Sequence, residues 1–413
     1  MRSLNVFAVG ALLTGLVALA PLAQAQAPAA GVAAFEGARL ILGDGNVIEN
    51  GTLVTEGARI VAAGKAGEVQ VPPSASRINL AGKTVMPALI DTHVHLSPSR
   101  EGIVRDLLRR GYFGVSAALS MGMDKYDVLD IRAQPIVGAA KFLSAGRGIT
   151  MPEPGRLTAP HWINTEAEGR KAVEELAEQK VDIVKIWVDT REGKYKKLTP
   201  EIYGAIIDEA HKHGLRVSAH IFDLEDAKGL MRAGIDAFAH GVRDRDIDDE
   251  FVAMYKARPA LILTPNLPDR GVKVDLSWLK PQLPAAEFAK LEVANTDKPR
   301  EQAFFGIQAR NLKRLNDAGV RITMGTDGNR PWAPHEEMED MVLAGMTPMQ
   351  VIVASTRNSA DFLRLADAGT LQAGKSADFI VLEANPLDDI TNTRRMSAVY
   401  LRGAAVDRST PIQ

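Results

Sequence analysis

The chain has no cysteine at any of its 413 positions. This absence excludes disulfides, thiolate nucleophiles, cysteine-type zinc sites and lipid attachment through cysteine. An excess of charge of either sign is also lacking, because 49 Lys and Arg residues stand against 51 Asp and Glu residues. The net charge of −2 argues against a surface built for nucleic acid or for an anionic membrane. We therefore expect neither as a partner.

Long uncharged apolar runs are rare, and the one that stands out lies within the first 25 residues. Arg2 precedes the apolar stretch Val6–Ala20, and Ala23–Ala25 has the small-x-small form of a cleavage site. This pattern predicts a secretory signal peptide at residues 1–25, a periplasmic or secreted mature protein, and no membrane contact after its removal. A membrane anchor is the alternative, but the stretch is short for a span of about 20 residues, and no basic stop-transfer segment follows.

Both ends of the mature chain, residues 26–84 and 366–413, read as short strands with tight turns. Gly51–Thr55 and Ala58–Ala63 are expected to pair as a hairpin across the intervening Glu-Gly turn, and a strand-like run returns at Phe379–Glu383. Neither end is long enough to bury a core alone. We expect the two ends to meet as one small β-sandwich.

Between these ends, residues 85–365 alternate strand-like apolar runs with helix-like segments. Thr165 and Glu168 form a capping-box pattern at the start of one helix, and Gly214 and Gly234 end two others. Eight apolar runs occur, at Val85–Leu96, Gly114–Leu119, Pro135–Leu143, Val181–Val188, Arg216–Phe222, Ala237–His240, Ala260–Pro265 and Arg321–Gly325. Strand–helix alternation predicts parallel strands, and eight repeats predict an α/β fold of the closed (β/α)8 TIM-barrel class. A doubly wound open sheet is the alternative, but no glycine-rich phosphate turn follows the first strand.

The first of these runs ends in two histidines, His93 and His95, one residue apart. Because side chains alternate along a strand, both imidazoles point to the same face at the carboxyl end of the strand. Imidazole is a common metal ligand at neutral pH, and zinc accepts its nitrogen at roughly 2.0–2.1 Å. The alternative is a pair of hydrogen-bonded histidines without a metal.

Four further polar residues lie in apolar barrel strands or just beyond them: Lys185, His220, His240 and Asp327. Singly, each histidine reads as a hydrogen-bonded core residue, the lysine as a structural ion pair and the aspartate as a helix cap. A buried ammonium without a partner costs several kcal/mol, so something must compensate Lys185. Barrels of this kind build their sites at the carboxyl ends of the strands. Together with the histidine pair, these residues predict a metal site.

The ordered set of motifs resembles the amidohydrolase superfamily over nearly the whole mature chain. The matches are D-T-H-V-H at Asp91–His95, V-K-I at Val184–Ile186, A-H at His220, A-H-G at His240, G-T-D at Asp327 and G-T-L-Q-A-G-K-S-A-D-F-I-V-L at Gly369–Leu382. The pattern is most similar to the imidazolonepropionase-like metal-dependent hydrolases, including their prolidase-type and ochratoxin-type members.

This resemblance implies a site for two divalent ions, expected to be zinc. His93, His95 and Asp327 would hold the more buried ion, and His220 and His240 the other. Lys185 would bridge them as a carbamate formed from its amine and CO2, which removes the buried ammonium. Imidazolonepropionase itself lacks that lysine, so the resemblance favours hydrolysis with two metals. Asp327 is also the expected catalytic proton shuttle.

The resemblance further implies cleavage of an acyl–amino-acid C–N bond by a metal-bridging hydroxide. N-acyl amino acids, dipeptides and ochratoxin-like aromatic amides are the expected small-molecule substrates. A two-metal site also serves lactones, carbamates and phosphotriesters, which remain an alternative. A catalytically silent binding or scaffold protein is a second alternative, and the sequence leaves a homo-oligomer open.

Contacts with the substrate are expected from the loops at the catalytic face. Aromatic side chains suggest a pocket for an aromatic group, and an arginine could hold a carboxylate in bidentate fashion. The segment 266–300 is long enough for a lid and carries several cations, although solvated loop charges would look the same. The candidate residues are His161, Trp162, Phe222, Arg243, Trp332 and His335.

Overall fold

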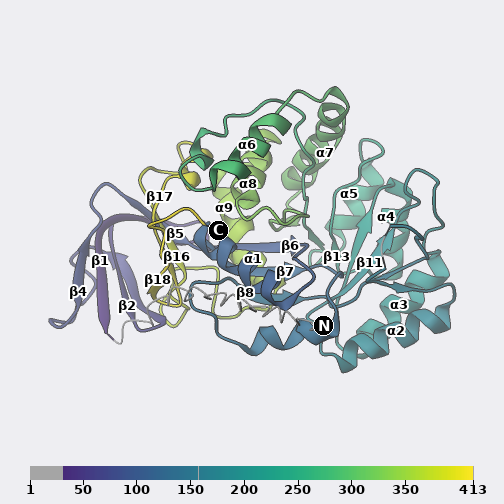
Figure 1. Ribbon diagram of the computed structural model, residues 1–413, viewed down its shortest axis with the longest axis horizontal. Helices are drawn as coiled ribbons and strands as arrows, with labels where there is room; N and C mark the ends of the chain where they lie inside the picture. Colours follow the sequence, from purple (N-terminus) through teal and green to yellow (C-terminus); the bar gives the residue numbers. More distant parts are fainter. Residues whose placement is uncertain (1–30, 157, 413) are drawn as a thin grey trace, which may run out of the picture.

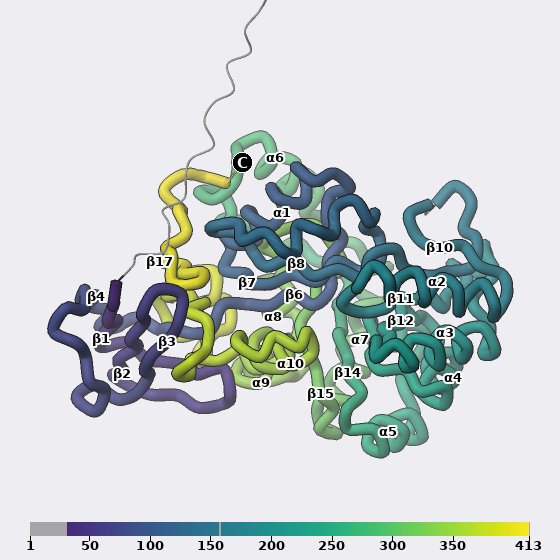
Figure 2. The backbone as a smooth tube through the Cα atoms, turned by 90° about the horizontal axis from the view of Figure 1, so that it is seen from below, coloured from purple at the N-terminus to yellow at the C-terminus, as the bar shows by residue number. Residues whose placement is uncertain are grey.

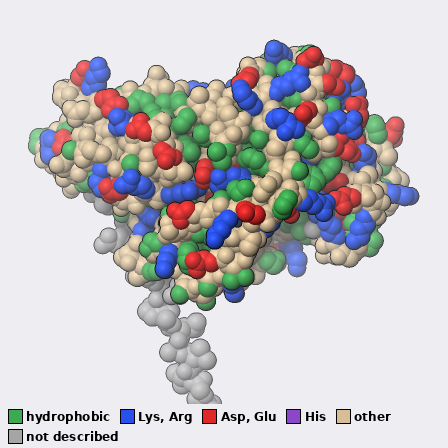
Figure 3. All heavy atoms as spheres, turned by 90° about the horizontal axis from the view of Figure 1, so that it is seen from above, with side chains coloured by type: hydrophobic (Ala, Val, Ile, Leu, Met, Phe, Trp, Pro, Cys, Tyr) green, Lys and Arg blue, Asp and Glu red, His purple; other side chains and the backbone are tan. Residues whose placement is uncertain are grey.

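The computed structural model describes residues 31–156 and 158–412, so the expected signal peptide lies outside the described residues. A small β-sheet at one end of the molecule adjoins a larger α/β body (Figure 1). None of the helices in the described ranges has the length and apolar character needed to cross a bilayer. Lys and Arg side chains are mixed with Asp and Glu over the face shown in Figure 3, as the near balance of charge predicts.

The small sheet combines both ends of the chain, as expected, but its strands are hydrogen-bonded in one sheet and not in the two sheets of the expected sandwich. It is one mixed sheet of eight strands in the order β18-β17-β16-β5-β1-β2-β3, with β4 pairing with β1. Its strands are β1 (Val32–Ile41), β2 (Val47–Glu56), β3 (Arg59–Lys65), β4 (Ser76–Asn79), β5 (Thr84–Pro87), β16 (Phe379–Leu382), β17 (Met396–Leu401) and β18 (Ala404–Ala405). The predicted hairpin is confirmed as β2–β3, and the antiparallel pair β5–β16 joins the two chain ends.

The larger body contains the eight predicted parallel strands of a TIM barrel. They are β6 (Leu89–Val94), β7 (Val115–Ser120), β8 (Lys141–Ser144), β11 (Val184–Val188), β12 (Val217–Ile221), β13 (Ala237–Phe238), β14 (Ile262–Leu263) and β15 (Arg321–Ile322). Among them β6, β7 and β8 lie side by side in Figure 2. Hydrogen bonding runs through β6-β7-β8 and through β11 to β15. A parallel bridge from Val94 to Gly328 and a bond from Asp182 N to Ser144 O connect these two groups. The short strands β9 (Ile149–Thr150) and β10 (His161–Trp162) lie between β8 and β11 in the chain.

The apolar run Val85–Leu96, which reads as one strand, is two strands in two different sheets. Pro87 ends β5, and proline has no N–H for a sheet ladder. The next two amides then bond to different bodies, Ala88 N to Asp378 O and Leu89 N to Gly114 O. The run is continuously apolar because both sheets bury it.

The helices surround the barrel, and the three whose start or end was predicted, α2, α3 and α4, begin or end at the expected residues. They are α1 (Arg100–Tyr112), α2 (Glu166–Glu178), α3 (Pro200–Lys212), α4 (Leu224–Ala233), α5 (Asp249–Lys256), α6 (Ala285–Ala294), α7 (Pro299–Asp317), α8 (Ala333–Leu343), α9 (Pro348–Val353) and α10 (Ser359–Phe362). Short 3-10 turns occupy Tyr126–Ala133, Ser277–Leu279 and Ile390–Arg394, and a π turn at Ala354–Asn358 separates α9 from α10. The capping box of Thr165 and Glu168 is confirmed, and Gly214 and Gly234 take left-handed φ angles of 68° and 97°.

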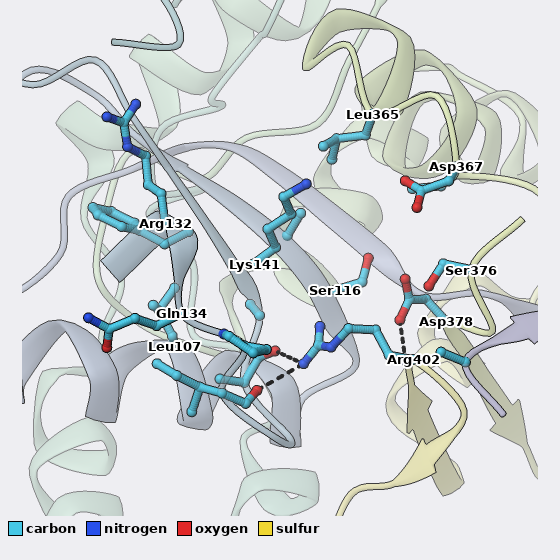
Figure 4. A pocket seen from close by; sticks show the side chains of 18 of the residues that line it. Leu107, Ser116, Arg132, Gln134, Lys141, Leu365, Asp367, Ser376, Asp378 and Arg402 are labelled. Atoms are coloured by element: carbon cyan, nitrogen blue, oxygen red, sulfur yellow. Dashed lines mark hydrogen bonds between the residues drawn. The ribbon is translucent and has the colours of Figure 1, made fainter. Parts of the chain in front are cut away.

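A cavity of about 470 Å³ lies where the small sheet meets the amino ends of β7 and β8 (Figure 4). Ser116, Lys141, Asp378 and Arg402 contribute to its lining. Arg402 donates hydrogen bonds of 2.9 Å to two backbone carbonyls at Ile136 and Ala139. The lining contains none of the six predicted metal residues, all of which the structure describes. Because barrel sites form at the opposite strand ends, we do not assign the reaction to this cavity.

Gly111 in α1 gives a test of how this helix packs. A Cβ at this position would lie 1.9 Å from the carbonyl oxygen of Gly138, so Gly111→Ala is expected to destabilise the fold by about 1–3 kcal/mol in urea unfolding. The matched control is Gly204→Ala in α3, where a Cβ meets nothing within 4 Å. Since alanine favours helix, the control should gain up to about 1 kcal/mol. Equal stability of the two variants would contradict the packing of α1.

Candidate metal centre

The four predicted histidines form a row of adjacent rings at the carboxyl ends of the barrel strands. Ring centroids are 5.2 Å apart for His93 and His95, 5.3 Å for His93 and His240, and 4.5 Å for His220 and His240. Asp327 faces this row, with Oδ1 at 3.2 Å from His93 Nε2 and 3.0 Å from His95 Nε2. Its Oδ2 lies 3.5 Å from His240 Nε2. Residues far apart in the sequence thus converge as predicted.

The donor atoms fit a divalent cation. One ligand atom from each of His93, His95 and Asp327 lies within 4.8 Å of the others. The Nε2 atoms of His93 and His240 are buried and have no hydrogen-bond partner among the described residues. Leaving a buried polar atom unpaired costs about 1–3 kcal/mol, so a bound ion would relieve a real penalty. Imidazole nitrogen and carboxylate oxygen are also the donors that zinc accepts.

Lys185 is completely buried beside this row. Its Nζ has no hydrogen-bond partner among the described residues and lies 5.4 Å from the Trp187 ring centroid. Burial lowers the pKa of Lys185 to about 7, although the charge of Asp327 acts in the opposite direction. A second ion between His220 and His240 stays a prediction, and so does a carbamate on Lys185. The buried and unpaired Nζ of Lys185 is compatible with both.

Asp327 is held in a strained backbone conformation. Its φ angle is 49°, which is uncommon for a residue other than glycine, and such strain is frequent at functional sites. The N–H groups of Thr326 and Asp327 both donate to His93 O, at 3.1 and 2.9 Å, and buried Arg110 donates to Gly328 O at 2.9 Å. The loop after β15 is therefore tied directly to the strand that carries the histidine pair.

The Asp327 carboxylate is ionised at neutral pH. Burial acts to raise its pKa, but the neighbouring rings of His240 and His93 and the hydrogen bond from His95 hold the pKa well below its usual value. The side chain keeps 36% of its surface exposed, whereas the His93 side chain has none. Asp327 can therefore both contact an ion and exchange a proton with a molecule at the mouth of the site.

Sequence reasoning missed the residues that orient His220. Asp189 Oδ2 lies 2.9 Å from His220 Nε2, and Arg191 Nη1 lies 2.8 Å from the same nitrogen. Arg191 also pairs with Asp189 at 2.6 Å and with buried Glu153 at 3.3 Å. Asp189 follows Lys185 by four positions, so the alternation of strand side chains would have placed it on the same face. Carboxylates that orient a ligand histidine typically tune metal affinity.

Sequence reasoning also missed Asn266, which lies just beyond β14 with a φ angle of 44°. Its Nδ2 lies 2.6 Å from His93 Nδ1 and donates to the carbonyl of Ala239. This contact occupies the Nδ1 side of the His93 ring and turns Nε2 toward Asp327. The left-handed backbone at Asn266 gives no clear sequence pattern, because asparagine is common in ordinary turns.

Two of the predicted substrate contacts lie at or beside the metal centre. Arg243 donates to His240 Nδ1, and its buried Nε has no hydrogen-bond partner among the described residues. Trp332 is buried and lines a cavity of about 420 Å³, together with Leu267 and Thr326. Thr326 precedes Asp327 in the chain, so this cavity begins next to the centre. The segment predicted as a lid forms one wall and contains α6.

The other predicted substrate contacts have different surroundings. Phe222 packs against Phe304 of α7, with ring centroids 6.3 Å apart. His161 bonds to the Tyr126 hydroxyl at 2.8 Å, and Trp162 is 39% exposed on β10. The structure does not bring His335 to either cavity described above: its ring is buried, with Nδ1 3.1 Å from Thr393 Oγ1 and Nε2 3.0 Å from Phe113 O.

The buried imidazoles predict a pH-dependent stability of the protein after chelation. Burial lowers the pKa of His93 and of His220 to about 3, against 6.5 for an exposed ring. Between these values only the unfolded chain binds the protons. Stability present above about pH 6.5 should therefore fall with falling pH, by up to about 1.4 kcal/mol per pH unit for each ring. Urea unfolding at a series of pH values measures this dependence of the unfolding free energy on pH. The variant His220→Asn should have a weaker dependence than the wild type. An equal dependence in the two proteins would contradict burial of the neutral His220 ring.

Known proteins share both the fold and most of this length. Residues 84–406 match the sequence profile described as the Amidohydrolase family. Imidazolonepropionase of Deinococcus radiodurans is 25% identical, over 88% of this chain and 94% of its own. Ochratoxinase of Aspergillus niger is 24% identical, over 92% of this chain and 87% of its own. The solved structure of a proposed prolidase from Bifidobacterium longum is 27% identical, with a TM-score of 0.76 over 94% of this chain and 97% of that one.

Proposed function

The chain belongs to the amidohydrolase family, and from this premise we propose that it is a two-metal hydrolase that cleaves the amide bond between an acyl group and an amino acid. One observation carries the proposal. The buried Nε2 atoms of His93 and His240 and the Nζ of Lys185 have no hydrogen-bond partner among the described residues, and Asp327 faces the histidine row. Buried nitrogen atoms without partners lower the stability of the fold, unless they bind a ligand such as a metal ion.

The residues divide naturally between two ions, proposed to be zinc. His93, His95 and Asp327 would hold one, and His220 and His240 the other, with carboxylated Lys185 between them. When bound, two divalent ions would activate a water molecule for attack at neutral pH and polarise the substrate carbonyl. Ochratoxinase and prolidase among the relatives support an amide or dipeptide as the substrate.

The chain's own groups supply proton transfer and orientation. Asp327, ionised and partly exposed, takes the proton of the attacking water and returns it to the leaving nitrogen. Asp189 keeps the His220 ring in place through its bond to Nε2. Arg243 is assigned to the substrate carboxylate, because its buried Nε–H is unpaired among the described residues and an arginine binds a carboxylate with two parallel bonds.

Metal analysis and a substrate panel test this function. Protein reconstituted with zinc and bicarbonate should hold about two ions per chain by mass spectrometry. N-acetyl-phenylalanine and alanyl-proline should have the highest kcat/KM in a panel that includes a homoserine lactone, a carbamate and a phosphotriester. A metal content near one, or faster hydrolysis of the lactone or phosphotriester, would contradict the proposal.

We also propose that the protein is exported, with residues 1–25 as the signal peptide. The expected mature chain begins at Gln26. Mass spectrometry of the protein from the periplasm or the medium measures its amino end. A cell-associated chain that retains Met1 would contradict export.

A further inference from the structure

The cavity of about 420 Å³ beside the metal centre contains a carboxyl group that has no cationic partner in the described part of the chain. The four cations that line the cavity already have partners: Arg270 pairs with Glu339 at 3.0 Å, Lys298 with Asp269 at 2.6 Å, Arg330 with Glu336 at 3.1 Å, and Arg394 also with Glu339. These cations are therefore not free to bind an anionic ligand.

Glu337 of α8 is the exception among the cavity's buried carboxylates. It is 4% exposed, and both of its oxygens accept from the single N–H of Leu267, at 3.1 Å each. Within residues 31–156 and 158–412, no Lys, Arg or His pairs with it. Asp340 adds further negative charge close by, and burial together with that charge holds the pKa of Glu337 well above its usual value. These surroundings favour the uncharged carboxyl, and a cationic group placed beside Glu337 would favour the carboxylate and form a buried ion pair with it.

The position of Glu337 connects this carboxylate to the reaction. Leu267, which donates to it, follows Asn266, whose side chain bonds to His93. On the other side the cavity begins at Thr326, the neighbour of Asp327. A substrate whose scissile bond lies at Asp327 would thus extend its next group into the cavity. The volume of about 420 Å³ accommodates a long side chain, since small-molecule sites span roughly 300–1,000 Å³.

We propose that this cavity is a substrate subsite for a positively charged group, an ammonium or guanidinium, which pairs with Glu337. The assignment rests on the proposed function and narrows its substrates to amides that carry a basic group. Trp332 forms part of the cavity wall, and an aromatic ring there adds attraction for a cation. Both oxygens of Glu337 accept from the N–H of Leu267, and a bound cationic group would supply the positive charge that this buried carboxyl group lacks.

Matched substrate pairs test the subsite. N-acetyl-arginine against N-acetyl-citrulline places the charge on the leaving amino acid, and 6-aminohexanoyl-methionine against hexanoyl-methionine places it on the acyl group. In one of the two pairs the cationic member should have a kcat/KM about 10²-fold higher, as the loss of a buried charge partner usually costs. Glu337→Gln should remove the preference, and Glu337→Asp should restore part of it.

Glu336→Gln is the matched control, because Glu336 lies on the same helix and lines the same cavity but already pairs with Arg330. It should keep the preference for the cationic substrate. Equal rates within both pairs in the wild type, or a preference that survives in Glu337→Gln, would overturn the proposal.

Calorimetric titration separates this inference from the proposed function. The probes are arginine against citrulline, and 6-aminohexanoate against hexanoate, none of which needs to be hydrolysed. Tighter binding of a cationic probe to the wild type than to Glu337→Gln supports the subsite even if no amide is cleaved. Glutamine keeps an acceptor for Leu267 N–H, so the variant should fold, and its melting temperature checks this. Equal binding within both pairs would contradict the subsite even in an active amidase.

Discussion

Replacing Asp327 by asparagine is expected to lower kcat/KM for an N-acyl amino acid by about 10²–10⁴-fold, the usual range for loss of a general acid–base group. Asparagine keeps the shape that fits against His93 and His95, but it cannot take a proton from water or return one to the leaving nitrogen. It also removes the negative charge opposite the histidine row, so the content of bound metal should fall. Steady-state kinetics and metal analysis of the same preparation measure both effects.

Asp317→Asn is a suitable control for this variant. Asp317 ends α7 and pairs with Lys313 on the surface at 2.6 Å, so its loss should leave kinetics and metal content unchanged. Hydrolysis that continues at the wild-type rate in Asp327→Asn would remove the assigned proton shuttle. It would also revive the alternative of a protein that binds its ligand without turning it over.

Lys185→Met is expected to abolish measurable hydrolysis while leaving the fold intact or more stable. Methionine fills a similar volume, and it replaces a buried amine without a hydrogen-bond partner among the described residues. Replacing buried charged groups by apolar ones is often neutral or stabilises by about 1–4 kcal/mol. The proposed bridge between the ions would be lost, so the metal content should fall from about two ions toward one. Urea unfolding and mass spectrometry test these two results.

The contrasting control is Lys228→Met. Lys228 is also buried, but it pairs with Asp248 at 2.6 Å and Glu250 at 2.7 Å. Its replacement leaves Asp248 without its cation, while Glu250 keeps Arg232 at 2.9 Å. This variant should therefore lose up to about 1 kcal/mol of stability and keep its metal. If both lysine variants behaved alike, Lys185 would have only a structural role.

The sequence predicted the parts of the site that depend on strand periodicity. His93 and His95 share a face because they lie two residues apart on one strand, and His220 and His240 end neighbouring parallel strands. The eight strands and the capped helices could also be read from local patterns. These features depend on residues close in sequence, where the geometry of one element is enough.

Features that depend on contacts between helices and strands could not be predicted as well from the sequence. His335 was expected at the rim of the site but is buried against Phe113 and Thr393. Glu337, two residues later on the same helix, lines the cavity instead. Two residues correspond to roughly 200° around a helix, so the two side chains leave opposite faces. The sequence shows the helix, but the direction it faces is set by packing against α7, α9 and the 3-10 turn at Ile390–Arg394.

The break at Ala88 was also hidden, because burial in two different sheets leaves one uninterrupted apolar pattern. The π turn between α9 and α10 could not be predicted for a similar reason. Its residues, Ala354–Asn358, have ordinary helix-forming neighbours, and the change of hydrogen bonding carries no distinct sequence pattern.

The passage of one apolar run from the small sheet into the barrel also limits how the protein can be rearranged. A cut at Ala88 falls five positions before His93, and it would separate β5, which pairs with β1 and β16, from β6, which pairs with β7. Modules exchanged between relatives by recombination would therefore carry the sheet and the first catalytic strand together. The small sheet and the barrel are therefore expected to be inherited together, because one short segment of chain supplies a strand to each.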